Sequence, residues 1–147
     1  MIFNGVKNLK YFIKKMIFIV IIILISGCGL SDYKVDLPNG YVLYAPSAHN
    51  VYIILEDDKI IPPKVVEMNY DDRYIIAKQF GLKRKYPDNI QNTYQIPDET
   101  KIYYWIIDMY DGKSYGPFDN YNQFSNLMKE LNIKSLELKS VESFREK

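Results

Sequence analysis

The sequence has one cysteine, Cys28, and one histidine, His49, in 147 residues. A single thiol cannot form a disulfide within the chain, so Cys28 must be free, joined to another molecule, or modified. Zinc sites use several cysteine or histidine ligands, and this chain cannot supply such a set. A Ser–His hydrolase would depend on His49, but a polar residue ahead of a predicted strand is the simpler interpretation. We therefore expect no metal site.

Carboxylates remain as candidates for chemistry. Asp57–Asp58 and Asp71–Asp72 could form an acid pair for sugar hydrolysis, but adjacent acids at turns are usually solvated. Asp108, Asp111 and Gly112 resemble part of a calcium loop, yet the alternate positions lack ligands and no glutamate closes the loop. A glycine-rich phosphate loop is also missing. We expect no cofactor. Whether the protein is an enzyme stays open, and the sequence leans against it.

The charge is nearly balanced, with 19 cations and 18 acids. Four of the lysines lie within residues 1–27, so the remainder has 15 cations against 18 acids, a net charge of −3. A mildly acidic domain has no bulk attraction for nucleic acid, and we expect no nucleic-acid partner. Lys83-Arg84-Lys85 beside Tyr86 could contact phosphates or anionic headgroups, or could be a solvated loop.

Residues 1–27 have the pattern of a secretory signal peptide. Lys14 and Lys15 precede an apolar run over 16–25, and the small residues Ser26 and Gly27 follow. The run is shorter than the roughly 20 residues that span a bilayer comfortably. An uncleaved N-terminal anchor, or an ordinary signal peptide that ends near a cysteine, remains an alternative.

The segment Ile25-Ser26-Gly27-Cys28 resembles the lipobox of bacterial lipoproteins. This resemblance implies a diacylglyceryl group on the Cys28 sulfur, with acyl chains such as palmitate, and cleavage between Gly27 and Cys28. More than one acyl chain is needed because a single chain gives only marginal membrane binding. We expect an extracytoplasmic protein that is anchored to the cell membrane by lipid, with membrane lipid as its first partner.

The rest of the chain divides into a lipid-anchored tether (28–40), a single domain (41–140) and a tail (141–147). Alternation and turn residues predict strands at 41–44, 51–55, 74–77 and 102–107. Asp111-Gly112 predicts a two-residue hairpin, and Gly116-Pro117 should end the returning strand. Apolar residues at helical spacing predict a helix over 120–131, capped by Asn120 and ended at Asn132. A short strand is expected within 133–138.

These elements predict an α+β fold, in which an antiparallel sheet of four to six strands has one main C-terminal helix packed on it. The stretch 81–100 is polar, contains two prolines and shows no sustained period. Twenty residues without secondary structure are unusual in a compact domain. This stretch is therefore a functional loop, a variable insertion, or a region with an element that the pattern does not reveal.

The predicted strand over 102–107 is apolar on both sides, which implies that both of its faces are covered. One helix covers only one face. The other must be covered by the 81–100 loop, by a second sheet, or by a partner. In the last case Tyr103 and Trp105 would form an interaction surface.

The motifs Trp105-Ile106-Ile107-Asp108 and Tyr115-Gly116-Pro117-Phe118-Asp119 resemble those of an uncharacterised family of small Gram-positive bacterial lipoproteins, classed as a domain of unknown function. Phe124, Leu131-Asn132-Ile133, Leu37-Pro38-Asn39-Gly40-Tyr41 and Ile60-Ile61-Pro62 extend the likeness. It covers most of residues 28–135. These motifs form turns and helix ends, and the resemblance implies no activity.

The expected function is a non-enzymatic envelope module, lipid-anchored through Cys28, that contacts an envelope protein or another envelope component. Two alternatives remain. One is an inhibitor or immunity-type lipoprotein that blocks an incoming or secreted factor. The other is an envelope enzyme that depends on carboxylates.

Overall fold

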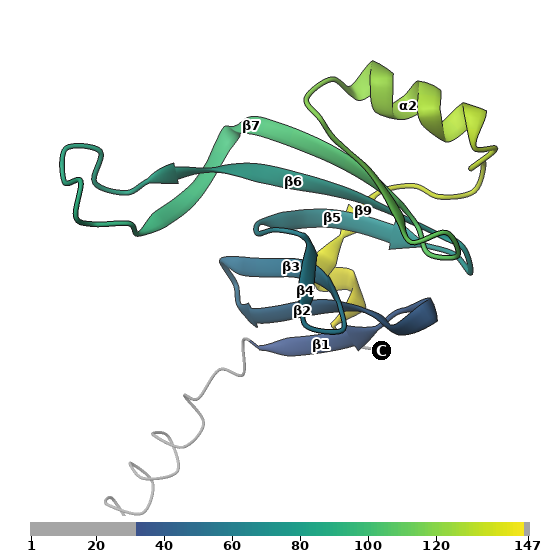
Figure 1. The fold of residues 1–147 in the computed structure, drawn as a ribbon, viewed down its shortest axis with the longest axis horizontal. Helices are drawn as coiled ribbons and strands as arrows, with labels where there is room; N and C mark the ends of the chain where they lie inside the picture. Colours follow the sequence, from purple (N-terminus) through teal and green to yellow (C-terminus); the bar gives the residue numbers. More distant parts are fainter. Residues whose placement is uncertain (1–31, 146–147) are drawn as a thin grey trace, which may run out of the picture. The chain divides into compact units, whose positions relative to one another are not determined.

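The computed structural model describes residues 32–145, so the predicted signal peptide, the Gly27–Cys28 cleavage site and the lipid attachment site lie outside it. Within residues 32–145 the fold is mostly β, with two antiparallel sheets of four and five strands and one short α-helix (Figure 1). The predicted α+β fold, with one sheet and a main helix on it, is therefore wrong. The sequence located strands of both sheets but did not show that they divide into two sheets.

The smaller sheet, sheet A, has the order β1-β2-β3-β4. Its strands are β1 (Tyr33–Asp36), β2 (Tyr41–Ser47), β3 (Asn50–Leu55) and β4 (Asp58–Ile61). The whole of β1 falls within the predicted tether, where the short alternation of polar and apolar residues was too weak to indicate a strand. Between β1 and β2, the short 3-10 helix η1 (Pro38–Gly40) turns the chain, with positive φ at Asn39 and Gly40.

The larger sheet, sheet B, has the order β8-β7-β6-β5-β9. Its strands are β5 (Val65–Tyr70), β6 (Tyr74–Arg84), β7 (Gln95–Asp108), β8 (Lys113–Phe118) and β9 (Lys139–Ser140). The two central strands are much longer than predicted, since β6 continues seven residues beyond Ala77 and β7 begins seven residues before Ile102.

Sheet A covers one face of sheet B and forms the larger core with it. Ile75, Ala77 and Ile107 of sheet B share this core with Leu43 and Ile53 of sheet A, and all five are fully buried. The intervening residues of the same strands point to the opposite face. Because both faces of β6 and β7 are covered, these strands are apolar on both sides, as the sequence had suggested.

The opposite face of sheet B is covered by α2 (Tyr121–Glu130) and the segment that follows it. Phe124 stacks on Tyr104 of β7, with ring centroids 5.1 Å apart, in a second core that includes Ile76, Ile106 and Ile133. This helix is one short element of a largely β structure.

The ends of α2 agree with the prediction. The side chain of Asn120 accepts a hydrogen bond from the backbone N–H of Asn122 at 2.8 Å. At the other end Asn132 has φ of 59°, its N–H donates to the carbonyl of Lys129, and the N–H of Ile133 donates to that of Met128. This pair of bonds is the Schellman motif, which satisfies carbonyls at the end of a helix.

Three local predictions around the helix are wrong. The β7–β8 connection has four residues, because Asp108 pairs with Lys113, although Gly112 has the expected positive φ of 63°. Strand β8 continues through Pro117, which is tolerated because β8 is an edge strand. The structure assigns no strand within 133–138, and β9 begins only at Lys139.

The predicted tail is part of the core. The 3-10 helix η2 (Val141–Phe144) buries Val141 and Phe144 in the larger core, and the Tyr33 hydroxyl donates to the Val141 carbonyl at 3.2 Å. The domain therefore begins at β1 and includes residues 141–144.

Candidate binding site on the β6–β7 arm

Strands β6 and β7 run past the rest of sheet B as a two-stranded arm, which we define as residues 80–102 (Figure 1). The last β6 residue paired with β5 is Gln79, opposite Val65. Five further β6 residues at roughly 3.3 Å each extend the arm by about 17 Å before its loop begins. About half of the predicted polar loop at 81–100 is thus strand, namely residues 81–84 of β6 and 95–100 of β7. A ribbon that buries neither face has no apolar alternation, which is why the sequence did not reveal it.

A bulge at the base of the arm shifts the register. Phe80 pairs with Ile102 but Gly81 pairs with Asp98, so β7 has three extra residues there. The Asp98 carboxylate accepts hydrogen bonds from the Thr100 hydroxyl at 2.6 Å and from its N–H at 3.3 Å, which holds the bulge closed. A Cβ on Gly81 would lie 2.8 Å from the Cβ of Lys101, so this close approach of the two strands requires glycine.

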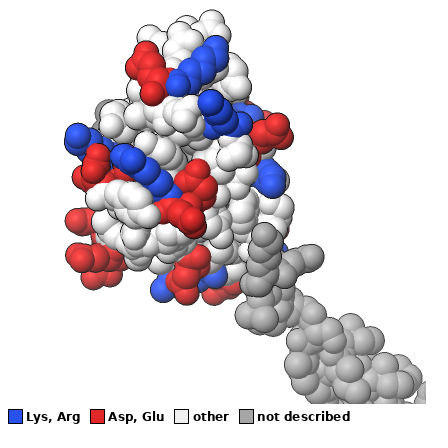
Figure 2. Space-filling model, turned by 90° about the vertical axis from the view of Figure 1, so that its right-hand side faces the viewer, with Lys and Arg blue, Asp and Glu red and all other residues white. Residues whose placement is uncertain are grey.

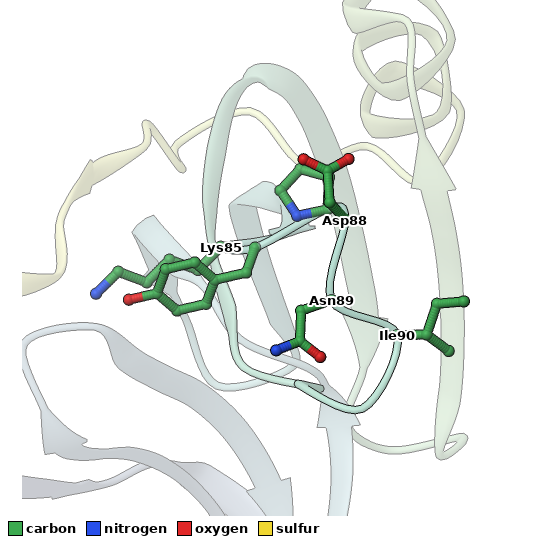
Figure 3. A pocket seen from close by; sticks show the side chains of 6 residues that line it. Lys85, Asp88, Asn89 and Ile90 are labelled. Carbon is green, nitrogen blue, oxygen red and sulfur yellow. The ribbon is translucent and has the colours of Figure 1, made fainter.

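The loop at the end of the arm, residues 85–94, is called the tip. The Lys85 N–H donates to the Tyr94 carbonyl at 3.0 Å and closes it. Within the tip, the side chain of Asn89 accepts from the N–H of Gln91, and that of Asn92 accepts from the N–H of Tyr94. These Asx turns give the loop internal order, and the two asparagines were the sequence signal for them. In Figure 3 Asn89 points into the loop, whereas Ile90 points away from it.

Three large apolar or aromatic side chains are exposed at the tip. The exposed fractions are 49% for Tyr86, 80% for Ile90 and 57% for Tyr94. The Lys85 ammonium lies 5.5 Å from the ring centroids of both Tyr86 and Tyr94, within the range of cation–π attraction. Clustered exposed apolar residues on a small domain often indicate a contact surface.

Cations accompany these residues. Lys83, Arg84 and Lys85 follow one another on the chain, and Lys83 lies 3.7 Å from the Asp98 carboxylate. At the other end of the molecule positive and negative side chains are interspersed, as Figure 2 shows for the face on the right of Figure 1. Over residues 80–102 the arm has four cations (Lys83, Arg84, Lys85 and Lys101) and three acids (Asp88, Asp98 and Glu99), a net charge of +1. It therefore combines exposed apolar groups with a slight positive charge, in a chain whose predicted mature part has a net charge of −3.

A groove lies between the arm and the β2–β3 turn. Two adjoining hollows, of about 430 and 350 Å³, share His49, Tyr94, Gln95 and Pro97 as lining residues. The second hollow is also lined by Lys64, Lys85, Ile96 and Glu99. Sequence reasoning treated His49 as a polar residue ahead of a strand, and the structure places it in this groove, exposed at the β2–β3 turn.

The residues predicted for an interaction surface, Tyr103 and Trp105, lie on the face of β7 that is turned toward sheet A. Trp105 is partly buried, packs against the larger core, and donates its indole N–H to Oε1 of Gln79 at 2.7 Å. Gln79 in turn donates to the carbonyls of Pro62 and Pro63. Sheet A and these prolines thus cover the face around Trp105. Of the three covers that the sequence left open for this face, the structure has the second sheet. Whether a partner also contacts Tyr103 or Trp105 stays a prediction.

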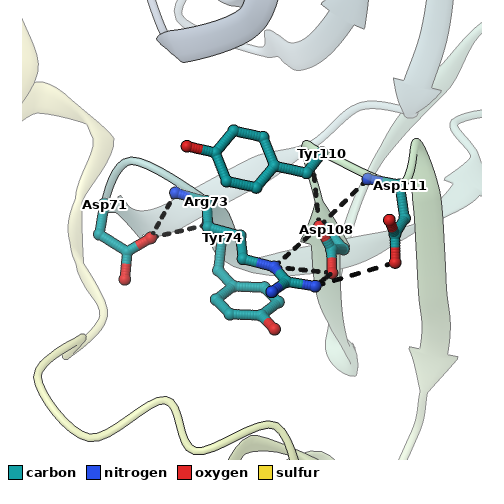
Figure 4. A network of polar contacts seen from close by, with 6 residues as sticks. All are labelled: Asp71, Arg73, Tyr74, Asp108, Tyr110 and Asp111. Atoms are coloured by element: carbon teal, nitrogen blue, oxygen red, sulfur yellow. Dashed lines mark hydrogen bonds and ion pairs between the residues drawn. The ribbon is translucent and has the colours of Figure 1, made fainter.

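The main network of charged residues ties together two turns at the end opposite the arm (Figure 4). Arg73 donates to Asp108 through Nε and Nη2, with the shorter contact at 2.7 Å, and Asp108 also accepts from the N–H groups of Tyr110 and Asp111. These bonds lower the pKa of Asp108, with the Arg73 bond contributing most and burial opposing it. The network pairs a buried carboxylate and orders the β7–β8 turn, which is a structural role.

Within residues 32–145, no group of three or more metal-ligating side chains comes together, and no helix is long and apolar enough to cross a bilayer.

The comparison with protein families matches residues 38–142 to the model described as "Protein of unknown function (DUF3997)". The chain belongs to this family. Comparison with curated proteins and with solved structures found no match. The DUF3997 match includes all of β2 to β9 and the whole arm. The resemblance noted in the sequence motifs to a domain of unknown function is confirmed. Lipid attachment and a Gram-positive source remain expectations.

Proposed function

We propose that this DUF3997 protein is a non-enzymatic, lipid-anchored module of the bacterial envelope that uses the arm as its contact element. The observation that carries the proposal is the exposure of Tyr86, Ile90 and Tyr94 at the end of an ordered two-stranded projection. Isolated exposed apolar residues are common, but three on one short loop beside consecutive cations are a pattern typical of contact surfaces.

The anchoring half of the proposal is supported by the Ile25-Ser26-Gly27-Cys28 segment. Because β1 begins at Tyr33, only the four residues 29–32 lie between Cys28 and the first strand. A lipid on Cys28 would therefore hold the domain close to the membrane surface.

Mass spectrometry of the membrane-associated protein tests the anchor. We expect an N-terminal peptide that begins at Cys28 and carries acyl mass, and a Cys28→Ala variant that accumulates as uncleaved precursor. A main species in which Gly27 and Cys28 remain joined and unmodified would contradict the anchor.

Photocrosslinking from the arm tests the contact element. A photoreactive residue at position 90 should give crosslinks to an envelope component in the native membrane, whereas one at Asp72, an exposed turn residue at the other end of β6, should not. Equal crosslinking from both positions would show that the arm is not the contact element.

A further inference from the structure

The arm and the start of the domain lie at the same end of the molecule. Tyr33 at the beginning of β1 pairs with Ala45 of β2, two residues before Ser47. Ser47 lines the groove together with Tyr94 of the arm. In Figure 1, β1 begins at the end of the sandwich from which the arm projects, while the β7–β8 turn lies at the opposite end.

The chain from Cys28 to the first strand and the arm also have similar lengths. The five residue-to-residue steps from Cys28 to Tyr33 span at most about 17 Å when extended. The arm projects about 17 Å beyond its last contact with β5, with the tip beyond that. A membrane plane that contains the lipid on Cys28 is therefore within reach of the tip.

The chemistry of the tip matches a lipid interface. Tyrosine is enriched at the headgroup level of bilayers, where its ring lies among apolar groups and its hydroxyl remains wet. Ile90, which points away from the loop, is an apolar group able to enter between lipids. Arg84 and Lys85 can place their charges against anionic headgroups while their carbon chains follow the apolar surface.

We infer that the tip inserts into the headgroup region of the same anionic bilayer that holds the lipid on Cys28, so that the domain is fixed to the membrane at two points. This inference rests on the lipid anchor proposed above. A protein partner would explain the exposed tyrosines equally well, but it would not account for the location of the tip at the anchored end. The bilayer accounts for both.

Tryptophan fluorescence in vesicles tests this inference on the full chain, purified from its membrane. Ile90→Trp would be compared with Asp72→Trp, a matched exposed position at the other end of β6. The parent protein, whose single tryptophan is Trp105, gives the background emission to subtract. The vesicles combine phosphatidylcholine with phosphatidylglycerol and carry brominated acyl chains, which quench tryptophan only within the bilayer. We expect the added emission at position 90 to shift to the blue and to be quenched, and that at position 72 to do neither.

A charge variant tests the anionic requirement. Arg84→Glu with Lys85→Glu should lower quenching of Ile90→Trp in phosphatidylglycerol vesicles and remove its dependence on salt. Lys83 stays unchanged because it lies near Asp98. The matched control, Lys113→Glu with Lys134→Glu, makes the same change in net charge at exposed positions away from the arm and should leave the quenching unaltered.

The outcomes separate the two proposals. Equal quenching at positions 90 and 72, or none at either, would overturn membrane insertion by the tip. An Ile90→Trp signal that responds only to added envelope protein or polymer would overturn it in favour of that partner. The mass of the Cys28 peptide is measured separately, so a missing lipid would contradict the anchor without deciding the position of the tip.

Discussion

The indole N–H of Trp105 donates a 2.7 Å hydrogen bond to Oε1 of Gln79 on the neighbouring strand. The two residues lie on the face of sheet B that sheet A covers. Because Trp105 is the single tryptophan of the chain, its fluorescence reports on this face alone. We expect weak quenching of Trp105 by iodide in the detergent-solubilised protein. Strong quenching of the folded monomer would show that sheet A does not cover this face and would indicate an interaction surface there.

Gln79 should be important for stability. It is buried, accepts from Trp105, and donates to the carbonyls of Pro62 and Pro63 at 2.8 and 3.0 Å. Gln79→Leu leaves these groups without their partner, so we expect the free energy of unfolding to fall by about 1–3 kcal/mol. Gln91→Leu, at an exposed tip position, is the control and should change it little. Equal stability of the two variants in urea titration would contradict the role of Gln79.

Asp108 should stabilise the fold and make its stability depend on pH. Asp108→Ala removes the bonds from Arg73 and from two backbone N–H groups, which we expect to lower the free energy of unfolding by about 2 kcal/mol. Asp111→Asn is the control, since Asp111 is exposed and lies 3.8 Å from Arg73, and it should change stability by roughly 0.5 kcal/mol or less.

The pH dependence follows from the lowered pKa of Asp108. A carboxyl whose pKa is lower in the folded state stabilises the protein above its ordinary pKa of 3.8, and this stabilisation is lost as the pH falls through that value toward the folded pKa. Acidification from neutral pH should therefore destabilise the parent more than Asp108→Ala. Parallel losses in the two proteins would indicate that other carboxyls, such as Asp98, dominate.

Gly112 tests the β7–β8 turn. Its φ is 63°, and nothing lies within 4 Å of the Cβ it would carry, so a substitution there meets backbone strain and no clash. Gly112→Val should lower the free energy of unfolding by on the order of 1–2 kcal/mol because β-branched residues resist positive φ. Gly112→Asn should cost less, since asparagine tolerates this region. Thermal unfolding that is the same for all three proteins would contradict the turn geometry.

Periodicity predicted the elements that bury one regular face. The helix is one of them, because Phe124, Leu127 and Met128 follow helical spacing and Asn120 and Asn132 mark its ends. Four strands were located at least in part for similar reasons. The predicted fold nevertheless had a single sheet. A strand that is apolar on both sides shows that both faces are covered, but its sequence does not show what covers them.

The missed elements have weak periodicity for identifiable reasons. In β5 the register shifts between Val65 and Glu67, which disrupts alternation. The strands β1 and β9 have only four and two residues. The arm lies outside the core, so its sequence is polar and includes Pro97 within a strand. The basic run Lys83-Arg84-Lys85 was visible in the sequence, where contact with anionic groups and a solvated loop were both open, but its association with three exposed apolar side chains required the tertiary structure.

The position of η2 in the core determines when, during synthesis, the domain can finish folding. Val141 and Phe144 are buried beside strands from the first half of the domain, and the Tyr33–Val141 hydrogen bond joins residues 108 positions apart. Contacts that are distant in the sequence form late, and a nascent chain cannot make this one until residue 141 has emerged from the ribosome. The core therefore stays incomplete while the rest of the chain is being synthesised. If the protein is exported as we propose, this delay favours translocation, because the chain has not finished folding when the export machinery first meets its leader.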